Sequence, residues 1–336
     1  MSKIAAKNIS VTVCLLTWNG EKYLPMFLNS LLEQTFKNWE LLVLDNASAD
    51  NSVAVVSEYY PPAKIIRQKQ NVGFAKGNNL LIKWSKSDYV LVVNQDVVLD
   101  KNYLQVLVDF MSKHKQAGSV AGKLYYWDYD NNLMTETVDS FGLKIDRRRA
   151  VVDYLQGQDN PPMETQEVFG LSGAVVMYRR QALESIKYRI QDDDYEYFDE
   201  DFFAYKEDVD IAWRLRLWAW ENWLVADTRA HHHRSVASGL ALKKRSQNRG
   251  FVNKLSYRNQ WWLLFKNSFV KDLIHDSRFI FWYEFKKLIY LIIFERSTLT
   301  AWSDFFKYYS KMAKKRKYIM SNYQAKAESI NKWFYR

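Results

Sequence analysis

The chain is poor in cysteine, proline and glycine, with one, five and eleven copies among 336 residues. Because Cys14 is the single cysteine, an internal disulfide and a cysteine-based metal site are both excluded, and a cytoplasmic location is expected. The low proline and glycine content excludes a low-complexity chain, so we expect one or two compact domains. No stretch reaches the ~18 uncharged residues that a membrane-spanning helix needs, and the first ten residues lack the apolar core of a signal peptide.

Apolar residues make up 48% of the chain, enough for a sizeable core, but the charge is unevenly distributed. Residues 231–336 contain 22 lysines and arginines and 6 acidic residues, a net charge of +16. The first 230 residues contain 26 and 32, a net charge of −6. A basic C-terminal third predicts an anionic partner, and both nucleic acid and an anionic membrane surface attract clustered cations.

The first 120 residues alternate between short apolar runs and segments with helical spacing. The runs predict four strands, at residues 11–16, 40–44, 64–67 and 89–93, each followed by a helix. Such alternation, in units of roughly 30 residues, is typical of an α/β protein with a parallel sheet. These sheets bind ligands beyond the carboxyl ends of their strands, so polar residues at those ends are candidate site residues.

After residue 120 the pattern is less regular. We expect a strand over Val168–Met177, an acidic and aromatic stretch over Asp192–Asp201 and a helix from about Glu207. One side of that helix would be apolar: Val209, Ala212, Trp213, Leu217 and Trp220. The chain after Lys254 reads as mostly helical.

Two aspartates, Asp45 and Asp96, each follow an apolar run. A carboxylate at a strand end can hold a ribose hydroxyl or a metal ion, although an aspartate there can also simply cap a helix or start a turn. Together the two favour a nucleotide site. The nearby stretch with Gly73 and Gly77 matches neither a dinucleotide fingerprint nor a phosphate-binding loop, and alone it indicates only a flexible turn.

Three acids, Glu207, Asp208 and Asp210, occur within four residues at the start of a predicted helix. The helix dipole stabilises carboxylates there by ~0.3–1 kcal/mol each, which explains the charge sign but not the density. A carboxylate near a substrate hydroxyl is what a general base requires. The run His231–His233 is either part of a metal site or a surface loop, and consecutive histidines cannot all reach one ion.

Eight segments occur in an order that is typical of one enzyme family. They are VCLLTWNGEKYL, ELLVLDNASADNS, NVGFAKGNN, YVLVVNQDVVLD, GLSGAVVMYRR, FDEDFFAYKEDVDIAWRLR, VADTRAHHHRSVAS and YRNQWWLLFKN. They span about residues 10–268. In these segments the chain resembles the inverting glycosyltransferases of family 2, which have the GT-A fold, and most of all the rhamnosyltransferase-like enzymes that build bacterial cell-surface polysaccharides.

The resemblance implies a GT-A domain over residues 1–245, built on a mixed, mainly parallel sheet. Its Rossmann-like nucleotide-binding half would cover about residues 8–120 and its acceptor half about residues 121–245. Residues 246–336 would form a helical, basic and aromatic C-terminal region that contacts a membrane surface or a second copy of the chain.

The resemblance also implies a role for each motif residue. The nucleotide sugar would lie on Thr17, Asn19, Asp45, Asn46, Gly73, Asn94 and Gln95. Asp96 would hold a divalent cation, Mg²⁺ or Mn²⁺, on the diphosphate, with His232 as the second ligand, or His231 if the register shifts by one. Asp208 would be the general base, with Glu207 as the second candidate.

The chain departs from the family pattern at the metal motif. Asn94-Gln95-Asp96 supplies one carboxylate, whereas a full motif supplies two. We therefore expect weaker metal binding, in which diphosphate oxygens supply much of the coordination.

The implied reaction is inverting transfer of a sugar from a nucleotide diphosphate donor to a hydroxyl of a saccharide, with a lipid-linked saccharide as the favoured acceptor. Rhamnose from dTDP-rhamnose is the leading donor, and UDP-glucose, UDP-galactose and GDP-linked sugars stay open. A nucleotidyltransferase also uses a parallel sheet with strand-end carboxylates, but the chain lacks a glycine-lysine phosphate loop. Nucleic-acid binding by the basic C-terminus leaves Asp45, Asp96 and Asp208 unexplained, so no nucleic-acid partner is expected.

The C-terminal third is rich in aromatic and apolar residues from Trp261 to Phe294, interrupted by Glu284, Lys286 and Lys287. Such a stretch is too interrupted to span a bilayer but suits its interface, and the basic run 314–317 adds attraction to an anionic leaflet. We expect a peripheral protein on the inner face of the cell membrane. The alternative is that these aromatic residues form a packed core or a contact between copies.

Overall fold

The computed structural model describes residues 9–190, 194–234 and 245–335. Two parts of the predicted segments lie outside the described residues: Asp192 and Asp193 of the acidic stretch, and residues 235–238 of the histidine segment. The expected domain boundary at residues 245/246 lies where the description resumes.

The first half of the chain forms alternating strands and helices, as its apolar runs predict. Its strands are β1 (Val11–Thr17), β2 (Trp39–Asp45), β3 (Lys64–Arg67), β4 (Tyr89–Asn94) and β5 (Val97–Leu99). Its helices are α1 (Leu24–Leu32), α2 (Ser52–Tyr59), α3 (Gly73–Trp84) and α4 (Tyr103–Lys113). All four predicted strands are confirmed. Helix α3 already begins at Gly73, so Gly77 lies within a helix and not in the flexible turn that the sequence indicated.

The second half adds strands that mostly pair out of sequence order. They are β6 (Ala117–Asp128), β7 (Leu133–Ser140), β8 (Leu143–Ile145), β9 (Val151–Asp153), β10 (Gln166–Val168), β11 (Val175–Arg179), β12 (Tyr188–Arg189), β13 (Tyr195–Glu196) and β14 (Glu221–His232). The helical elements here are α5 (Arg180–Ile186), the 3₁₀ turn η1 (Glu200–Phe202) and α6 (Glu207–Leu217). The single strand expected over Val168–Met177 is wrong: residues 169–174 separate β10 from β11.

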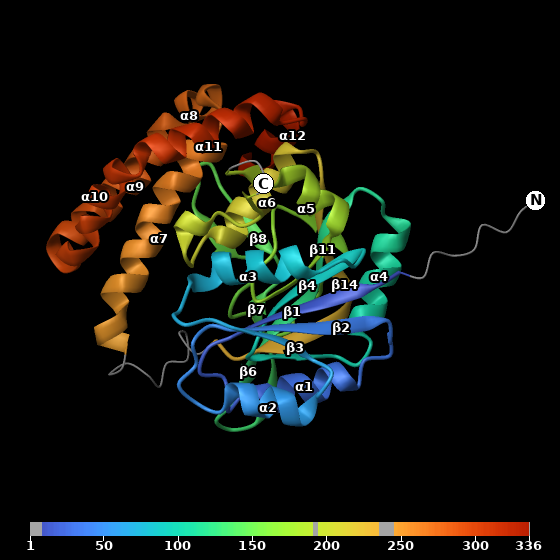
Figure 1. Ribbon diagram of the computed structural model, residues 1–336. Helices are drawn as coiled ribbons and strands as arrows, with labels where there is room; N and C mark the ends of the chain where they lie inside the picture. Colours follow the sequence, from blue (N-terminus) through green and yellow to red (C-terminus); the bar gives the residue numbers. More distant parts are fainter. Residues whose placement is uncertain (1–8, 191–193, 235–244, 336) are drawn as a thin grey trace, which may run out of the picture.

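The central sheet is mixed. Its order is β10-β14-β6-β11-β4-β1-β2-β3, with β5 paired to β14 and β7 paired to β6. Strands β4, β1, β2 and β3 run parallel, and the antiparallel β11 joins them to the second half. The GT-A-type architecture that the resemblance implied is confirmed, with β1 to β4 as its parallel half (Figure 1).

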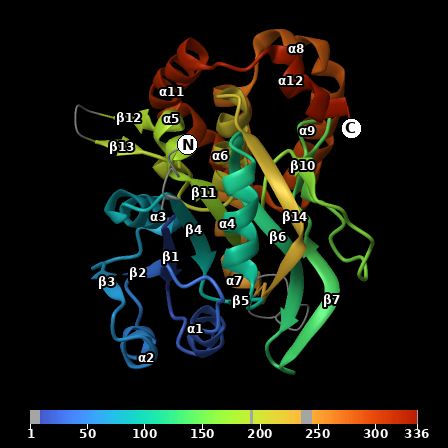
Figure 2. The ribbon, with the colours of Figure 1, turned by 90° about the vertical axis from the view of Figure 1, so that its right-hand side faces the viewer.

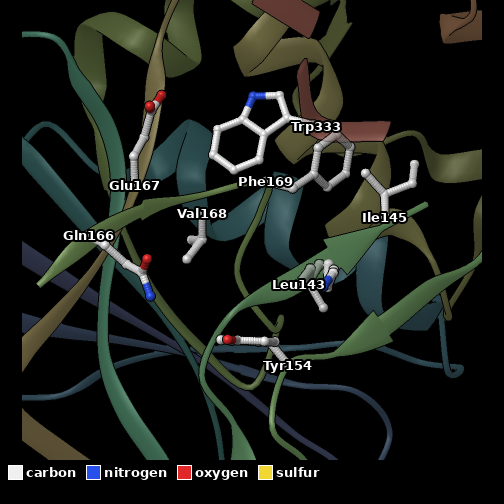
Figure 3. Close-up of a pocket in the computed structure, with 9 residues that line it drawn as sticks. Leu143, Ile145, Tyr154, Gln166, Glu167, Val168, Phe169 and Trp333 are labelled. Carbon is white, nitrogen blue, oxygen red and sulfur yellow. The ribbon is translucent and has the colours of Figure 1, made fainter. Parts of the chain in front are cut away.

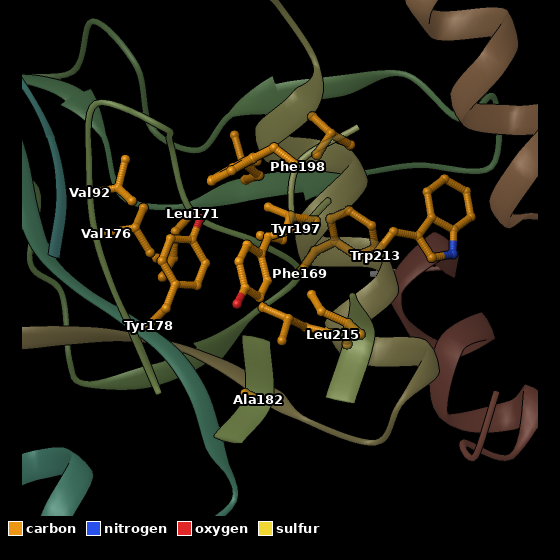
Figure 4. Close-up of a cluster of buried hydrophobic side chains, with 14 of the residues drawn as sticks. Val92, Phe169, Leu171, Val176, Tyr178, Ala182, Tyr197, Phe198, Trp213 and Leu215 are labelled. Carbon is orange, nitrogen blue, oxygen red and sulfur yellow. The ribbon is translucent and has the colours of Figure 1, made fainter. Parts of the chain in front are cut away.

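Alternate side chains of the parallel strands serve two different cores, because successive residues of a strand point to opposite faces. Val13 and Leu15 face the core formed with α1 and α4, whereas Cys14 between them faces the core on the side of α3, α5 and α6. Figure 1 shows α1 and α2 on one side of the sheet and α3, α5 and α6 on the other. Figure 4 shows the second core, with Val92 and Val176 from the sheet at one end and Trp213 and Leu215 of α6 at the other.

Helix α6 is buried on nearly all sides, including Arg214 and Arg216. The prediction of a single apolar side for this helix is therefore wrong, because nearly every side is buried. Trp220, which that prediction includes, lies after the helix and just before β14. Both arginines are satisfied internally, Arg214 by Asp210 and the carbonyls of Ile186 and Tyr197.

The C-terminal third is helical, as predicted. It comprises α7 (Arg245–Asn267), α8 (Val270–His275), α9 (Ser277–Phe294), η3 (Arg296–Thr300), α10 (Ala301–Lys307), α11 (Tyr309–Asn322), α12 (Ala327–Asn331) and η4 (Lys332–Tyr335). In Figure 1 these helices lie together along the left side and the top of the molecule, and Figure 2 shows α8, α11 and α12 at its top. In the described part of the chain, none of the helices is long and apolar enough to cross a membrane.

Several C-terminal side chains belong to the same core as α6. Trp262, Met312 and Phe334 belong to the same cluster as Trp213 and Phe169, and the Phe334 ring lies against Trp213. Asp276, fully buried before α9, accepts hydrogen bonds from Arg147 and Arg149, which lie between β8 and β9. Some aromatic residues of the C-terminal third, such as Trp262, therefore form a packed core, as the alternative to a membrane contact predicted. Helix α9, in contrast, is mostly exposed.

Candidate active site

The carboxyl ends of the parallel strands meet in register. Thr17 of β1 lies opposite Asp45 of β2, and Asp45 lies opposite Arg67 of β3. On the other side of β1, Leu16 lies opposite Asn94 of β4. The residues expected to hold the nucleotide therefore line one edge of the sheet, because parallel strands bring their carboxyl ends together.

Gln95 closes the turn that follows β1. The Thr17 hydroxyl donates to Gln95 Oε1 at 2.6 Å, the Trp18 N–H donates to the same oxygen at 2.9 Å, and Gln95 Nε2 donates to the Trp18 carbonyl. A Cβ at Gly20 would lie 2.2 Å from Gln95 Oε1, so only glycine allows this approach. Asn19 has a φ of 50° and accepts a bond from the Ala49 N–H, which joins this turn to the loop after β2.

Asn46 organises the next loop. Its Oδ1 accepts from the Val72 N–H at 2.8 Å and its Nδ2 donates to Asn71 Oδ1 at 3.0 Å. Asp45 is buried, and its Oδ1 accepts from the Ser48 N–H. The alternative that Asp45 caps the next helix is wrong, because α2 begins only at Ser52 and has no side-chain cap. Gly73 has a φ of +83°, and a Cβ there would lie 2.7 Å from the Phe203 carbonyl oxygen.

Asp96 lies next to one histidine of the run. His232 Nε2 is 3.4 Å from Asp96 Oδ1, and His232 Nδ1 is 2.7 Å from Asp139 Oδ2. The other two histidines have other neighbours: His231 stacks on Tyr125, and His233 Nδ1 lies 3.0 Å from the Trp127 carbonyl. All three are buried at the end of β14, so the surface-loop alternative is wrong, and His232, not His231, is the histidine next to Asp96.

The space between Asp96 and His232 attracts positive charge. Burial alone would lower the pKa of His232, but the carboxylates of Asp96 and Asp139 raise it to about 10. A divalent cation can take the place of the Nε2 proton, since oxygen and imidazole donors suit such ions and ligating histidines are usually held by a carboxylate behind them. Within the described residues no group of three or more candidate ligands occurs, so a cation here would need further ligands besides Asp96 and His232.

Asp208 is the more accessible of the two candidate bases. Asp208 is partly exposed and accepts from the N–H groups of Gly173 and Val209, at 3.1 and 2.8 Å. Burial raises its pKa, the Gly173 N–H opposes this shift, and the charge of Asp153 adds to it. Glu207 is 7% exposed and one of its carboxylate oxygens has no hydrogen-bond partner.

The surroundings of Glu207 and Asp208 affect their pKa values differently. Burial and the nearby charge of Asp208 raise the pKa of Glu207 to about 8. At neutral pH Glu207 is therefore mostly protonated. Two acids in contact commonly divide in this way, with one neutral and the other ionised.

A short backbone path connects Asp208 to β4, the strand that precedes Asp96. Asp208 binds the N–H of Gly173, and the next residue, Ala174, accepts a hydrogen bond from the Asn94 N–H at 2.9 Å. Asn94 is the last residue of β4, two positions before Asp96. The structure thus places Asp208 and Asp96 at the same edge of the sheet.

Helix α7 holds the loop that precedes Asp208. Phe203, Tyr205 and Lys206 all have positive φ values, between 63° and 70°, a conformation that costs side-chain-bearing residues free energy. Asn259 of α7, fully buried, directs its Nδ2 at the carbonyls of Phe202, Ala204 and Tyr205 at 2.8–3.0 Å. Residue periodicity alone did not reveal this role, and the only signal was the quoted segment YRNQWWLLFKN.

A buried ion-pair cluster extends the same contact. Lys266 of α7 pairs with Asp199 and Asp210, and Lys315 of α11 pairs with Asp199, Glu196 and Asp201. Lys266 and Lys315 are 1% and 2% exposed. Part of the basic charge of the C-terminal third is therefore neutralised by the acidic stretch before the candidate base.

A separate pocket of about 140 Å³ lies elsewhere (Figure 3). Its lining comes from β8, β10 and η4 and the segments beside them: Leu143, Lys144, Ile145, Tyr154, Gln166, Glu167, Val168, Phe169 and Trp333. None of the residues that the sequence predicted for the site lines it. The candidate site is instead the open edge of the sheet between Asp45, Asp96 and Asp208.

The glycosyl transferase family 2 model matches residues 12–187, which cover the parallel strands, their carboxyl-end loops and β11. The chain belongs to glycosyl transferase family 2. The resemblance of the motif order is thereby confirmed, and with it the assignment of the chain to the glycosyltransferases.

The individual proteins that this glycosyltransferase resembles have low sequence identity to it. GlyG of Streptococcus pneumoniae is 26% identical over 121 residues, 35% of this chain and 40% of GlyG. An N-acetylglucosaminyl-diphospho-decaprenol L-rhamnosyltransferase of Mycobacterium tuberculosis is 25% identical over 250 residues, 68% of this chain and 77% of that enzyme. The structure of Staphylococcus aureus TarS superposes with a TM-score of 0.51 at 18% identity, covering 81% of this chain and 42% of TarS. The chain thus spans less than half of two of these three relatives.

Proposed function

We propose that this glycosyltransferase moves a sugar from a nucleotide diphosphate donor to a saccharide hydroxyl with inversion at the anomeric carbon. One observation supports it most: a partly exposed carboxylate, Asp208, lies at the same sheet edge as the Asp96–His232 pair. Inversion requires one base and one leaving-group site on opposite sides of the reacting carbon. We assign the base to Asp208 and the leaving-group site to Asp96 and His232.

In the proposed reaction Asp208 accepts the proton of the acceptor hydroxyl as that oxygen attacks the anomeric carbon. The bond from that carbon to the diphosphate oxygen breaks, and its electron pair leaves with the nucleoside diphosphate. Asp96 and His232 would hold Mg²⁺ or Mn²⁺, which neutralises the departing charge when it is bound. Thr17, Asn19, Asp45, Asn46, Gly73, Asn94 and Gln95 would bind the rest of the donor.

The donor that we favour is dTDP-rhamnose. The rhamnosyltransferase of Mycobacterium tuberculosis supports it and also supports a lipid-linked acceptor, because that enzyme is named for a decaprenol-linked sugar. TarS, in contrast, was solved with UDP and with UDP-GlcNAc, so uridine donors are the alternative.

A panel of donors tests this proposal. The melting temperature should rise by several degrees with dTDP-rhamnose, because a ligand at 100 times its Kd stabilises the native state by about 2.7 kcal/mol. UDP-glucose, UDP-galactose and a GDP-sugar should have smaller effects. Mn²⁺ should increase the shift in the wild type but not in Asp96→Asn.

The matched control is Asp109→Asn, the same change on an exposed carboxylate of α4, which should respond to Mn²⁺ as the wild type does. A larger shift with a UDP-sugar would overturn the choice of donor. No shift with any nucleotide sugar would overturn the proposed function itself.

We also propose that the acceptor is met at an anionic membrane surface and that α9 contacts it. Six of its large apolar side chains are 40–60% exposed: Phe281, Trp282, Phe285, Ile289, Ile292 and Ile293. At 100° per residue they fall within one third of the helix circumference, opposite the buried Glu284 and Leu291. Arg278, Lys286 and Arg296 are exposed nearby, a combination that suits an anionic interface.

Flotation with phosphatidylglycerol liposomes at low salt tests this surface. The wild type should float with the liposomes, and Phe281→Glu combined with Ile289→Glu should weaken binding about 10²-fold or more, since each buried side chain contributes ~1.5–3 kcal/mol. Leu133→Glu, on an apolar side chain of β7 that is 55% exposed, is the control and should float like the wild type. Equal flotation of both variants, or a wild-type dimer that buries α9, would contradict the proposal.

A further inference from the structure

Asp139 of β7 is a buried carboxylate that no motif singled out. It is 0% exposed and contacts His232, the last residue of β14, and Arg234, which follows that strand. Its Oδ2 lies 2.7 Å from His232 Nδ1 and its Oδ1 lies 2.8 Å from Arg234 Nε. An isolated buried carboxylate is costly, and these two partners compensate its charge.

The sheet brings these groups together. Strand β6 lies between β7 and β14, pairing Tyr125 with Val138 on one side and Tyr126 with His232 on the other. The pairing of β6 with β7 shifts its register at Tyr125, and Asp139 lies at that irregularity. A register shift of this kind re-aims side chains next to functional sites.

The contact decides which nitrogen of His232 faces Asp96. The Asp139 carboxylate accepts the proton of His232 Nδ1, so the other ring nitrogen, Nε2, faces Asp96. Nε2 lies 3.4 Å from Asp96 Oδ1, where a cation would bind. Arg234 is clamped as well, since its Nη2 lies 2.6 Å from Asp153 Oδ2. Asp139 therefore anchors the end of β14 at the point where the site begins.

We propose that Asp139 is a positioning residue that orients His232 for divalent-cation binding at Asp96. The inference rests on the proposed function, because it assigns the cation to the nucleoside diphosphate at that site. Asp139 itself touches neither the cation nor the sugar. It acts by holding the ring of His232 in one orientation and one tautomer.

The test is the affinity for Mn²⁺, measured by electron paramagnetic resonance in the presence of dTDP or UDP. Asp139→Asn should weaken Mn²⁺ binding about 10–100-fold, the usual effect of losing a partner behind a metal ligand. Binding of the nucleotide without Mn²⁺ should be unchanged. Glu136→Gln, a carboxylate of the same strand that pairs with the exposed Arg229, is the matched control and should bind Mn²⁺ like the wild type.

A double-mutant cycle separates positioning from general damage. In a His232→Gln background, Asp139→Asn should have no further effect on Mn²⁺ affinity, because the ring that it positions is gone. An equal loss in both backgrounds would overturn the inference. So would wild-type Mn²⁺ affinity in Asp139→Asn.

A measurement on the wild type covers the case in which Asp139→Asn does not fold. Imidazole nitrogen NMR with Mg²⁺ and nucleotide should show the proton of His232 on Nδ1, and a proton on Nε2 would overturn the inference. If the wild type binds neither nucleotide nor Mn²⁺, the proposed function fails instead. The two failures are therefore distinguishable.

Discussion

Replacing Asp208 with asparagine should lower the turnover of the enzyme by about 10²–10⁴-fold, the usual contribution of a positioned general base. The amide keeps the shape of the side chain and can still accept the Gly173 N–H bond, but it cannot take the proton of an acceptor hydroxyl. The measurement is the rate of nucleoside diphosphate release with a saccharide acceptor. Donor binding, followed by thermal shift, should be nearly unchanged.

Glu207→Gln is the matched control for this change. Because the pKa of Glu207 is raised to about 8, its side chain is mostly neutral at pH 7, and glutamine resembles that neutral form. Its effect on turnover should be far smaller. The wild-type rate should also rise with pH through the raised pKa of Asp208, since only the ionised base accepts a proton. Near-normal turnover in Asp208→Asn, or a larger loss in Glu207→Gln, would reverse the two assignments.

Replacing Lys266 with methionine should lower the free energy of unfolding by about 3–5 kcal/mol, because it leaves the buried carboxylates of Asp199 and Asp210 without one of their cations. The measurement is urea denaturation. Lys311→Met is the control: that lysine is half-exposed and pairs with Asp201, and surface pairs contribute ~0–1 kcal/mol. If both variants lost a similar free energy of unfolding, the buried cluster would stabilise the fold no more than a surface ion pair does.

The pH dependence of stability gives an independent check of this cluster. Burial alone would raise the pKa of Asp199, but Lys266 and Lys315 hold it below its ordinary value of about 4. The ionised form of Asp199 is thus favoured in the folded state. Its contribution to stability is complete above about pH 4 and is lost as the pH falls further. In Lys266→Met, this acid-dependent part should be smaller.

These contacts make the C-terminal helices part of the candidate site. Asn259 holds the strained loop 203–206, Lys266 pairs with Asp210 of α6, and Asn267 donates to the same carboxylate. Removing α7 would therefore disturb Asp208 as well as any membrane contact. Part of the basic charge of this region is paired internally, at Lys266 and Lys315, whereas Arg278, Lys286 and Arg296 in and beside α9 are exposed.

The sequence by itself determined the parallel half of the fold and the candidate carboxylates. Apolar runs of four to seven residues and helical spacing are local signals, so β1 to β4 and the helices between them could be predicted. Asp45 and Asp96 follow because parallel strands end at one edge. Asp208 was identified through its acidic neighbours and through the family motif.

Only the tertiary structure decided which side chains meet across the second half of the sheet. Strands β6 and β14 pair residues about 100 positions apart, and no local pattern encodes that register. The pairing of β14 with β5, in which His232 lies opposite Val97, places His232 and not His231 against Asp96. The pairing of β6 with both β14 and β7 brings Asp139 behind His232. The contacts of Asn259 and Lys266 are equally distant in sequence, because a buried amide or ammonium finds its partners through packing and not through sequence spacing.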